Sequence, residues 1–244
     1  MPSKSLLMLL AAVLVALPVS LPAQQATKSP TAESESSWQA AIKARREQLI
    51  QQNGPGTDAA LRSQLLAMRD KDQAVRGFAG GKQVSGMTPD MLAKMPATDA
   101  ELTSELKQIV DQKGWPTISL VGIEASNGAM LVLTHSADHA WQAKLLPQLE
   151  QLADASRIDA SSLALVVDKE LVSEGKLQRY GTQFKFVNGE MAMFGVEDPG
   201  GLDRIRARAL LPPMDVYKQM LSQIYHVKTS NAIVSATPPA QKEN

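Results

Sequence analysis

The segment Thr117–His135, TISLVGIEASNGAMLVLTH, decides the fold class because it is compatible with two different structures. Two apolar runs flank Asn127-Gly128, a dipeptide that is typical of the two-residue turn in a β-hairpin. The alternative is a buried helix that Ser126 caps and that ends near Ser136. Local propensity favours the hairpin. The pattern of this segment alone leaves the fold class open.

Amphipathic helical patterns lie on both sides of this segment. Thr57 and Asp58 precede an apolar stripe in which Leu61, Leu65 and Met68 recur at helical spacing. Similar patterns begin at capping residues and end at glycine or proline. They predict helices over residues 36–53, from 89 onward as a short element, 98–113, 138–152, 159–174, 202–210 and 214–225.

One short β-hairpin is predicted near residues 183–195, QFKFVNGEMAMFG. Apolar and polar residues alternate on each side of Asn188-Gly189, and this combination of alternation and turn is the strongest hairpin signal in the chain.

The two ends of the chain differ in composition from the middle. Lys4, the apolar run Leu6–Leu17 and small residues near Ala23 are typical of a secretory signal peptide over residues 1–23. The run is shorter than the ~20 residues of a membrane-spanning helix. We predict a flexible linker over 24–37, a single folded domain over 38–227 and a disordered tail over 228–244. The mature protein is then secreted or periplasmic, without a stable membrane span.

Composition excludes several classes of function. The chain has 244 residues, with 25 Lys and Arg against 25 Asp and Glu, so it lacks the basic excess of a nucleic-acid-binding protein. It has no cysteine, which excludes disulfides, thiol catalysis and cysteine metal sites. The common hydrolase and nucleotide-binding motifs are absent, and we predict no cofactor.

Asp72 stands where the apolar stripe of the helix over 58–75 predicts an apolar residue. A carboxylate on such a face is costly unless it is paired. Arg76 lies one turn later, where the two side chains can meet. We predict a buried Asp72–Arg76 ion pair, which is either structural or part of a site.

His135 follows the apolar run Met130–Leu133, so it is either a hydrogen-bonded core residue or a general acid/base at a pocket wall. His139 lies four residues on, the spacing at which two imidazoles on one helix can share a metal ion. Asp138, however, is a typical N-cap residue for the next helix. His135 and His139 would then lie on different helices, and their rings would not share one helix face. We predict no metal site.

The segment Gln178–Gln183, QRYGTQ, gathers uncharged hydrogen-bonding side chains around one glycine. Gln178, Tyr180, Thr182 and Gln183 are candidates for binding a small polar ligand. The same groups can also satisfy the backbone of their own loop.

Several short motifs, taken in order, resemble a bacterial family known as a domain of unknown function. The family's motifs are D-Q-x-x-R, G-W-P, an apolar helix ending in histidine, Q-x-Y-G-T-Q, and D-P, L-P-P and Y near the end. The chain has them as Asp72-Gln73 with Arg76, Gly114-Trp115-Pro116, Leu131–His135, Gln178–Gln183, Asp198-Pro199, Leu211-Pro212-Pro213 and Tyr217, and it has Gln142 between them. The resemblance covers residues 61–225.

This resemblance implies a mainly α fold of about seven or eight helices, with the single small hairpin near 183–195. It places residues 126–136 in a helix, against local propensity. It implies no activity, so whether the protein is an enzyme stays open.

Two hypotheses for function use the same residues. In the first, an exported helical domain has a polar binding pocket, or a buried polar network, that includes Arg76, Gln142 and the 178–183 loop. In the alternative, a hydrolase-like enzyme uses His135 as general acid/base, with Asp72 and Arg76 beside it. Both hypotheses expect the loop and His135 to face one cleft.

Overall fold

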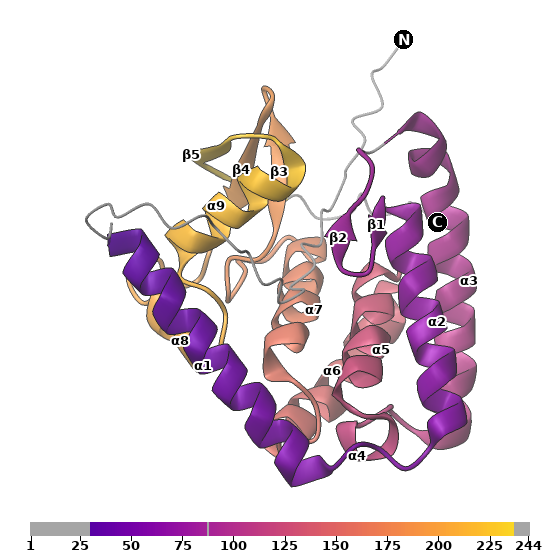
Figure 1. Ribbon diagram of the computed structural model, residues 1–244. Helices are drawn as coiled ribbons and strands as arrows, with labels where there is room; N and C mark the ends of the chain where they lie inside the picture. Colours follow the sequence, from indigo (N-terminus) through magenta and orange to yellow (C-terminus); the bar gives the residue numbers. More distant parts are fainter. Residues whose placement is uncertain (1–29, 87, 237–244) are drawn as a thin grey trace. The chain divides into compact units, whose positions relative to one another are not determined.

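The computed structural model describes residues 30–86 and 88–236 (Figure 1). Within these residues the chain forms nine helices and two small sheets, which confirms the mainly helical fold. The predicted signal peptide, the first part of the predicted linker and residues 237–244 lie outside the described residues.

The chain divides into two compact units, at residues 163 and 164. The single domain predicted over 38–227 stays a prediction. Each unit has a hydrophobic core of its own, which is the physical criterion for separate compact units. The first unit contains α1 (Pro30–Asn53), α2 (Ala59–Val75), β1 (Phe78–Ala79), β2 (Lys82–Gln83), α3 (Pro89–Lys113), α4 (Ile118–Val121), α5 (Ile123–His135) and α6 (His139–Asp154). The boundary falls within α7 (Ala160–Ser173), and the second unit continues with β3 (Phe184–Val187), β4 (Glu190–Phe194), α8 (Leu202–Arg208), α9 (Met214–Tyr225) and β5 (Thr229–Val234).

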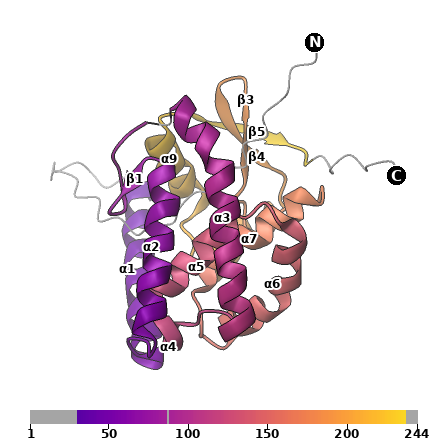
Figure 2. The ribbon, with the colours of Figure 1, turned by 90° about the vertical axis from the view of Figure 1, so that its right-hand side faces the viewer.

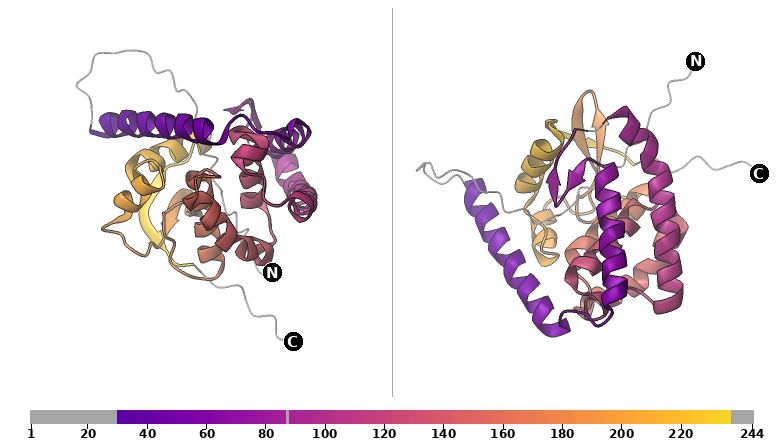
Figure 3. Two further views of the ribbon diagram at one scale, coloured as in Figure 1. Left: turned by 90° about the horizontal axis from the view of Figure 1, so that it is seen from below. Right: turned by 45° about the vertical axis from the view of Figure 1, so that its right-hand side comes forward.

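The first unit is built around α2, α3 and α5, each of which packs against the other two (Figures 2 and 3). Their facing sides supply buried apolar side chains, as the helical spacing predicts. These are Leu61, Leu65 and Met68 from α2, Leu102, Leu106 and Ile109 from α3, and Ala129, Met130, Val132 and Leu133 from α5.

The ambiguous segment is helical, because Ile123–His135 forms α5 and the local hairpin signal is overridden. Gly128, which would have been the turn glycine, instead lies where α5 approaches α2 closely. A Cβ atom at Gly128 would lie 3.2 Å from Cβ of Arg69 and 3.3 Å from the carbonyl oxygen of Leu65. The absence of a side chain therefore serves helix packing here, and tertiary contacts decide the structure of the segment.

Two predicted element boundaries in the first unit are wrong. α1 begins at Pro30, so residues 30–37 are helical and are not part of a flexible linker. Proline is tolerated in a first helical turn because its missing N–H has no partner there. Residues 89–113 form one continuous helix, α3, because Thr88 caps it by accepting from the Met91 N–H and Pro96 is accommodated inside it.

The second unit holds the predicted hairpin, β3–β4, with Phe184 opposite Met193 and Val187 opposite Glu190. The predicted tail is wrong in part, because residues 229–234 form β5, which pairs in parallel with β4. α9 packs against β5. The core of this unit consists of Phe184, Met191, Met193, Val196, Leu202, Tyr217 and Leu221.

None of the helices within residues 30–86 and 88–236 is long and apolar enough to cross a membrane.

Candidate functional site

Asp72 is the centre of a charged cluster in the first unit. Its side chain is buried on α2, among the apolar residues of that face. One carboxylate oxygen, Oδ1, lies 3.1 Å from Nη1 of Arg76 and 2.7 Å from Nδ1 of His135. The other, Oδ2, accepts a hydrogen bond of 2.9 Å from Nε2 of Gln73. The predicted buried Asp72–Arg76 pair is present, and His135 completes it.

Arg76 connects this carboxylate to a second one, which the sequence analysis did not identify. Its Nη2 donates to both carboxylate oxygens of Asp99, at 2.8 and 2.9 Å. The two residues are largely buried, with side-chain exposures of 12% for Arg76 and 17% for Asp99. Asp72, Arg76, Asp99 and His135, here called the Asp72 network, therefore tie α2 to α3 and α5.

The chemistry of Asp72 fixes the proton on His135. Burial raises the pKa of Asp72, but His135, Arg76 and Gln73 outweigh burial and hold the pKa below the ordinary value of an aspartate. An ionised carboxylate only accepts hydrogen bonds, so Nδ1 of His135 must donate. In the neutral imidazole Nε2 is then a bare acceptor, and no described residue hydrogen-bonds it.

Gln142 has a structural contact close to the end of α5. Its side chain is fully buried, and Nε2 donates to the carbonyl oxygen of Leu133 at 2.6 Å. That carbonyl, in the last turn of the helix, also accepts from the backbone N–H of Ser136 at 3.1 Å. The amide oxygen of Gln142 is buried without a partner among the described residues.

Asp168 is the centre of a separate polar cluster in the second unit. It is fully buried on α7 and accepts hydrogen bonds from the backbone N–H groups of Arg179, Tyr180 and Thr182, at 2.7 to 2.9 Å. The hydroxyl of Thr182 donates to it as well, at 2.9 Å. Burial raises the pKa of this carboxyl, and the four hydrogen bonds oppose that effect. The carboxylate thus holds the 178–183 loop by its amide hydrogens.

Arg206 binds carbonyl oxygens of the same loop. It is fully buried, and its Nη1 donates to the carbonyl of Tyr180 at 2.5 Å while Nε donates to that of Pro212 at 2.7 Å. Its guanidinium carbon lies 4.6 Å from the ring centroid of Tyr217, a cation–π contact. A buried carboxylate and a buried guanidinium therefore bind backbone N–H and C=O groups of the same loop.

The remaining candidate residues of the loop satisfy one another. Gln178 accepts from the backbone N–H of Gln183 at 2.8 Å and donates to the carbonyl of Phe194 at 2.7 Å. Gln183 donates to the hydroxyl of Thr182 at 3.1 Å. These contacts support the structural interpretation of the loop, and its contact with a ligand stays a prediction. So does the common cleft, because His135 and the loop belong to different units.

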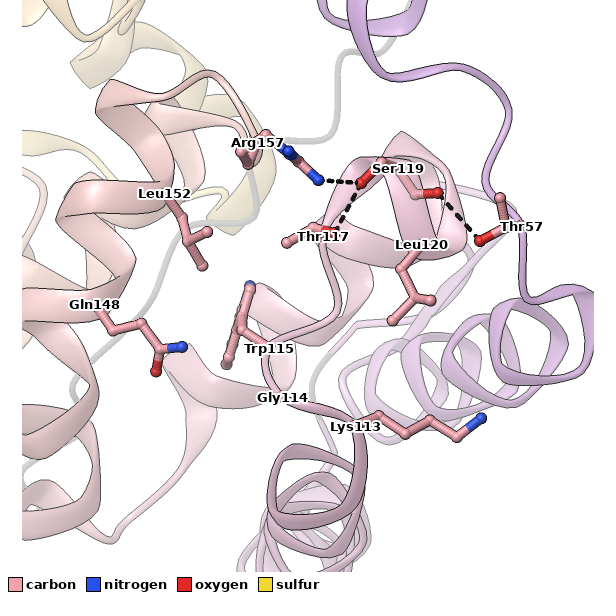
Figure 4. Close-up of a pocket in the computed structure, with 10 residues that line it drawn as sticks. All are labelled: Thr57, Lys113, Gly114, Trp115, Thr117, Ser119, Leu120, Gln148, Leu152 and Arg157. Carbon is pink, nitrogen blue, oxygen red and sulfur yellow. Dashed lines mark hydrogen bonds between the residues drawn. The ribbon is translucent and has the colours of Figure 1, made fainter.

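The surface of the first unit has two hollows that share Ser119 and Arg157. The first has a volume of about 360 Å³ and is drawn in Figure 4, where Trp115, Thr117, Gln148 and Arg157 surround it. Neither hollow includes a member of the Asp72 network.

Three functional or structural polar residues escaped the sequence analysis. Asp168 directly follows the apolar run Leu163–Val167 within a predicted helix, a local signal comparable to that of Asp72. Arg206 and Asp99 carry no comparable local signal, because their partners come from distant segments. Among the described residues, no group of three His, Asp or Glu side chains is arranged to hold a metal ion.

One comparison with known proteins gives a match. The model of a family of unknown function, DUF6624, matches residues 59–230, which include most of both units. No curated protein and no solved structure matches the chain. Because the match covers well over half of the sequence, the chain belongs to this family of unknown function.

Proposed function

We propose that the chain is an exported binding protein and that His135 is the group with which its first unit recognises a small polar ligand. The observation that carries this proposal is the 2.7 Å contact between Nδ1 of His135 and Oδ1 of Asp72. This contact fixes the ring orientation and leaves Nε2 as the unengaged nitrogen. A side chain held in one orientation loses little entropy when it binds a ligand.

The charges of the network indicate the chemistry of the ligand. Both terminal nitrogens of Arg76 are engaged by carboxylates, so Arg76 positions Asp72 and offers no bidentate face to an anion. With a neutral imidazole the network holds two carboxylates and one guanidinium, so it has an excess of one negative charge. A ligand that donates a hydrogen bond to Nε2, such as an ammonium, amide or hydroxyl group, fits this excess.

A second candidate function uses the same geometry for proton transfer. A carboxylate that orients an imidazole through Nδ1, with Nε2 unengaged, is the arrangement of a general base. The 2.7 Å contact favours a hydrolase-like role for His135 on this ground, with Asp72 as its orienting partner.

Two substitutions at position 135 separate these functions. His135→Asn keeps a donor near the position of Nδ1 for Asp72 but has no atom at Nε2. His135→Gln instead carries its amide to the Nε2 position. The wild-type chain is purified from the producing cells, and native mass spectrometry identifies the molecule that it carries.

For a binding protein we expect His135→Asn to lose this molecule while His135→Gln retains part of it. For a general base we expect the wild type to turn the molecule over and both variants to fail. If the wild type carries no molecule and its melting temperature is unchanged by a cell extract, both functions are excluded.

Export is tested separately by N-terminal sequencing of the mature protein. The proposal expects a first residue near Gln24, because the small residues near Ala23 suit a signal peptidase. An intact Met1 in the exported protein would contradict it.

A further inference from the structure

The hollow drawn in Figure 4 is the second candidate site in the first unit, and its lining has an unusual balance of hydrogen-bonding groups. Lys113 and Arg157 line it, and no Asp or Glu does. Lys113 is paired with Asp58 at 2.6 Å, so Arg157 supplies the uncompensated charge. Asp154 lines the adjoining hollow. The lining therefore carries two cationic side chains and no carboxylate.

Trp115 contributes a donor that has no acceptor. Its side chain is 3% exposed, and its indole Nε1–H has no hydrogen-bond partner among the described residues. In Figure 4 the nitrogen end of the ring is turned toward the space between Thr117, Leu152 and Arg157. Indole nitrogen can only donate, so its acceptor has to be a group other than the described residues. Gln148, which is exposed, and Leu152 also line the hollow.

Arg157 is oriented toward the same space by a short chain of hydroxyl groups. Its Nη2 donates to Oγ of Ser119 at 2.6 Å, and this oxygen lies 3.2 Å from Oγ1 of Thr117. The two hydroxyls have two hydrogens but share only one bond, so one hydrogen remains for a further acceptor. The guanidinium uses one of its five N–H groups in this contact and keeps the others for a ligand.

We infer that this hollow binds a small oxyanion, a carboxylate or a phosphate group, between Arg157, the Trp115 indole and the Thr117–Ser119 hydroxyls. A planar guanidinium matches the two oxygens of such a group. The oxyanion supplies the acceptor that Nε1 of Trp115 lacks and the negative charge that Arg157 lacks. This site is independent of the Asp72 network.

The test is calorimetric titration of the full chain with acetate and with inorganic phosphate, at constant ionic strength set with chloride. The two anions distinguish a carboxylate site from a phosphate site. We expect saturable binding of at least one of them, at least tenfold weaker in Arg157→Gln. Arg157→Lys keeps the positive charge but loses the paired N–H groups of the guanidinium. Its affinity for the anion should therefore lie between those of the wild type and Arg157→Gln.

Trp115→Phe removes the indole N–H but keeps an aromatic ring. We expect it to lower the affinity for the same anion several-fold. Lys82→Gln, an equal charge change at an exposed position on β2, is the matched control and should bind like the wild type. Equal affinities in the wild type and Arg157→Gln would overturn the inference. So would the absence of any binding tighter than about 10 mM in the wild type.

Discussion

Asp72 is an ionised side chain on the apolar face of a helix, so the stability of the first unit depends on its partners. The sequence predicted Asp72 and Arg76 as a pair because Arg76 follows Asp72 by four residues at the end of α2, and this spacing is local information. It placed His135 beside them only as a hypothesis about function, and it did not predict Asp99 as a partner. Those contacts depend on how α3 and α5 pack against α2, which no local pattern specifies.

Arg76→Ala is predicted to destabilise the protein strongly. Removing the guanidinium leaves two largely buried carboxylates close to each other, and breaking such a pair costs about 3–5 kcal/mol. The measurement is the free energy of unfolding in urea.

Lys71→Ala is the matched control, because Lys71 and Glu101 also connect α2 to α3 but their side chains are 47% and 61% exposed. That change should cost no more than about 1 kcal/mol. Equal losses of unfolding free energy in Arg76→Ala and Lys71→Ala would mean that the buried contacts of Arg76 stabilise the protein no more than an exposed ion pair does.

At the scale of elements, local sequence patterns did not predict α5 and β5. Asn127-Gly128 favours a turn locally, yet Gly128 lies in a helix because its lack of a side chain lets α5 approach α2. The family resemblance predicted that helix, whereas propensity did not. β5 was missed because a parallel pair joins distant segments, and residues 229–234 show no strong strand pattern of their own.

Truncation after Lys228 is predicted to loosen β4. The backbone N–H of Gly195 donates to the carbonyl of Val234 at 3.0 Å, and the truncation removes this acceptor. Hydrogen exchange at Gly195 should therefore become faster. The N–H of Phe194 donates to Gln183 within the hairpin at 3.2 Å and serves as the internal control.

The truncation result would contradict the β4–β5 pairing if exchange at Gly195 did not change. Acceleration at both amides would instead mean that the whole hairpin depends on β5.

At the scale of the whole molecule, the chain forms two compact units. Local patterns identified nearly every helix, and they could not divide the chain because the division depends on which elements pack together. Each unit encloses a buried charged group on a helix, Asp72 in the first and Asp168 in the second. Both positions interrupt apolar stripes, so polar residues inside such stripes are the most informative sequence signal here.

The stability of the whole chain should depend on pH through Asp72. Its pKa is lowered in the folded state, so its contribution is fully present above the unfolded value of about 3.9. The contribution is lost as the pH falls from that value through the lower folded pKa. We expect the difference in unfolding free energy between the wild type and Asp72→Asn to shrink as the pH falls below about pH 4.

Asp70→Asn is the control for that series, because Asp70 is exposed on the same helix. A difference that shrinks equally for Asp70 and Asp72 would show that His135, Arg76 and Gln73 do not lower the pKa of Asp72.

The central claim is that Asp72 holds His135 with the proton on Nδ1 and leaves Nε2 for a ligand. Long-range ¹H–¹⁵N NMR correlation of the imidazole nitrogens tests it directly, above the pH at which the ring titrates. The signals of His135 are assigned by their absence in His135→Asn. The account predicts a single tautomer that carries hydrogen on Nδ1. A ring that carries hydrogen on Nε2, or that averages both tautomers, would contradict it.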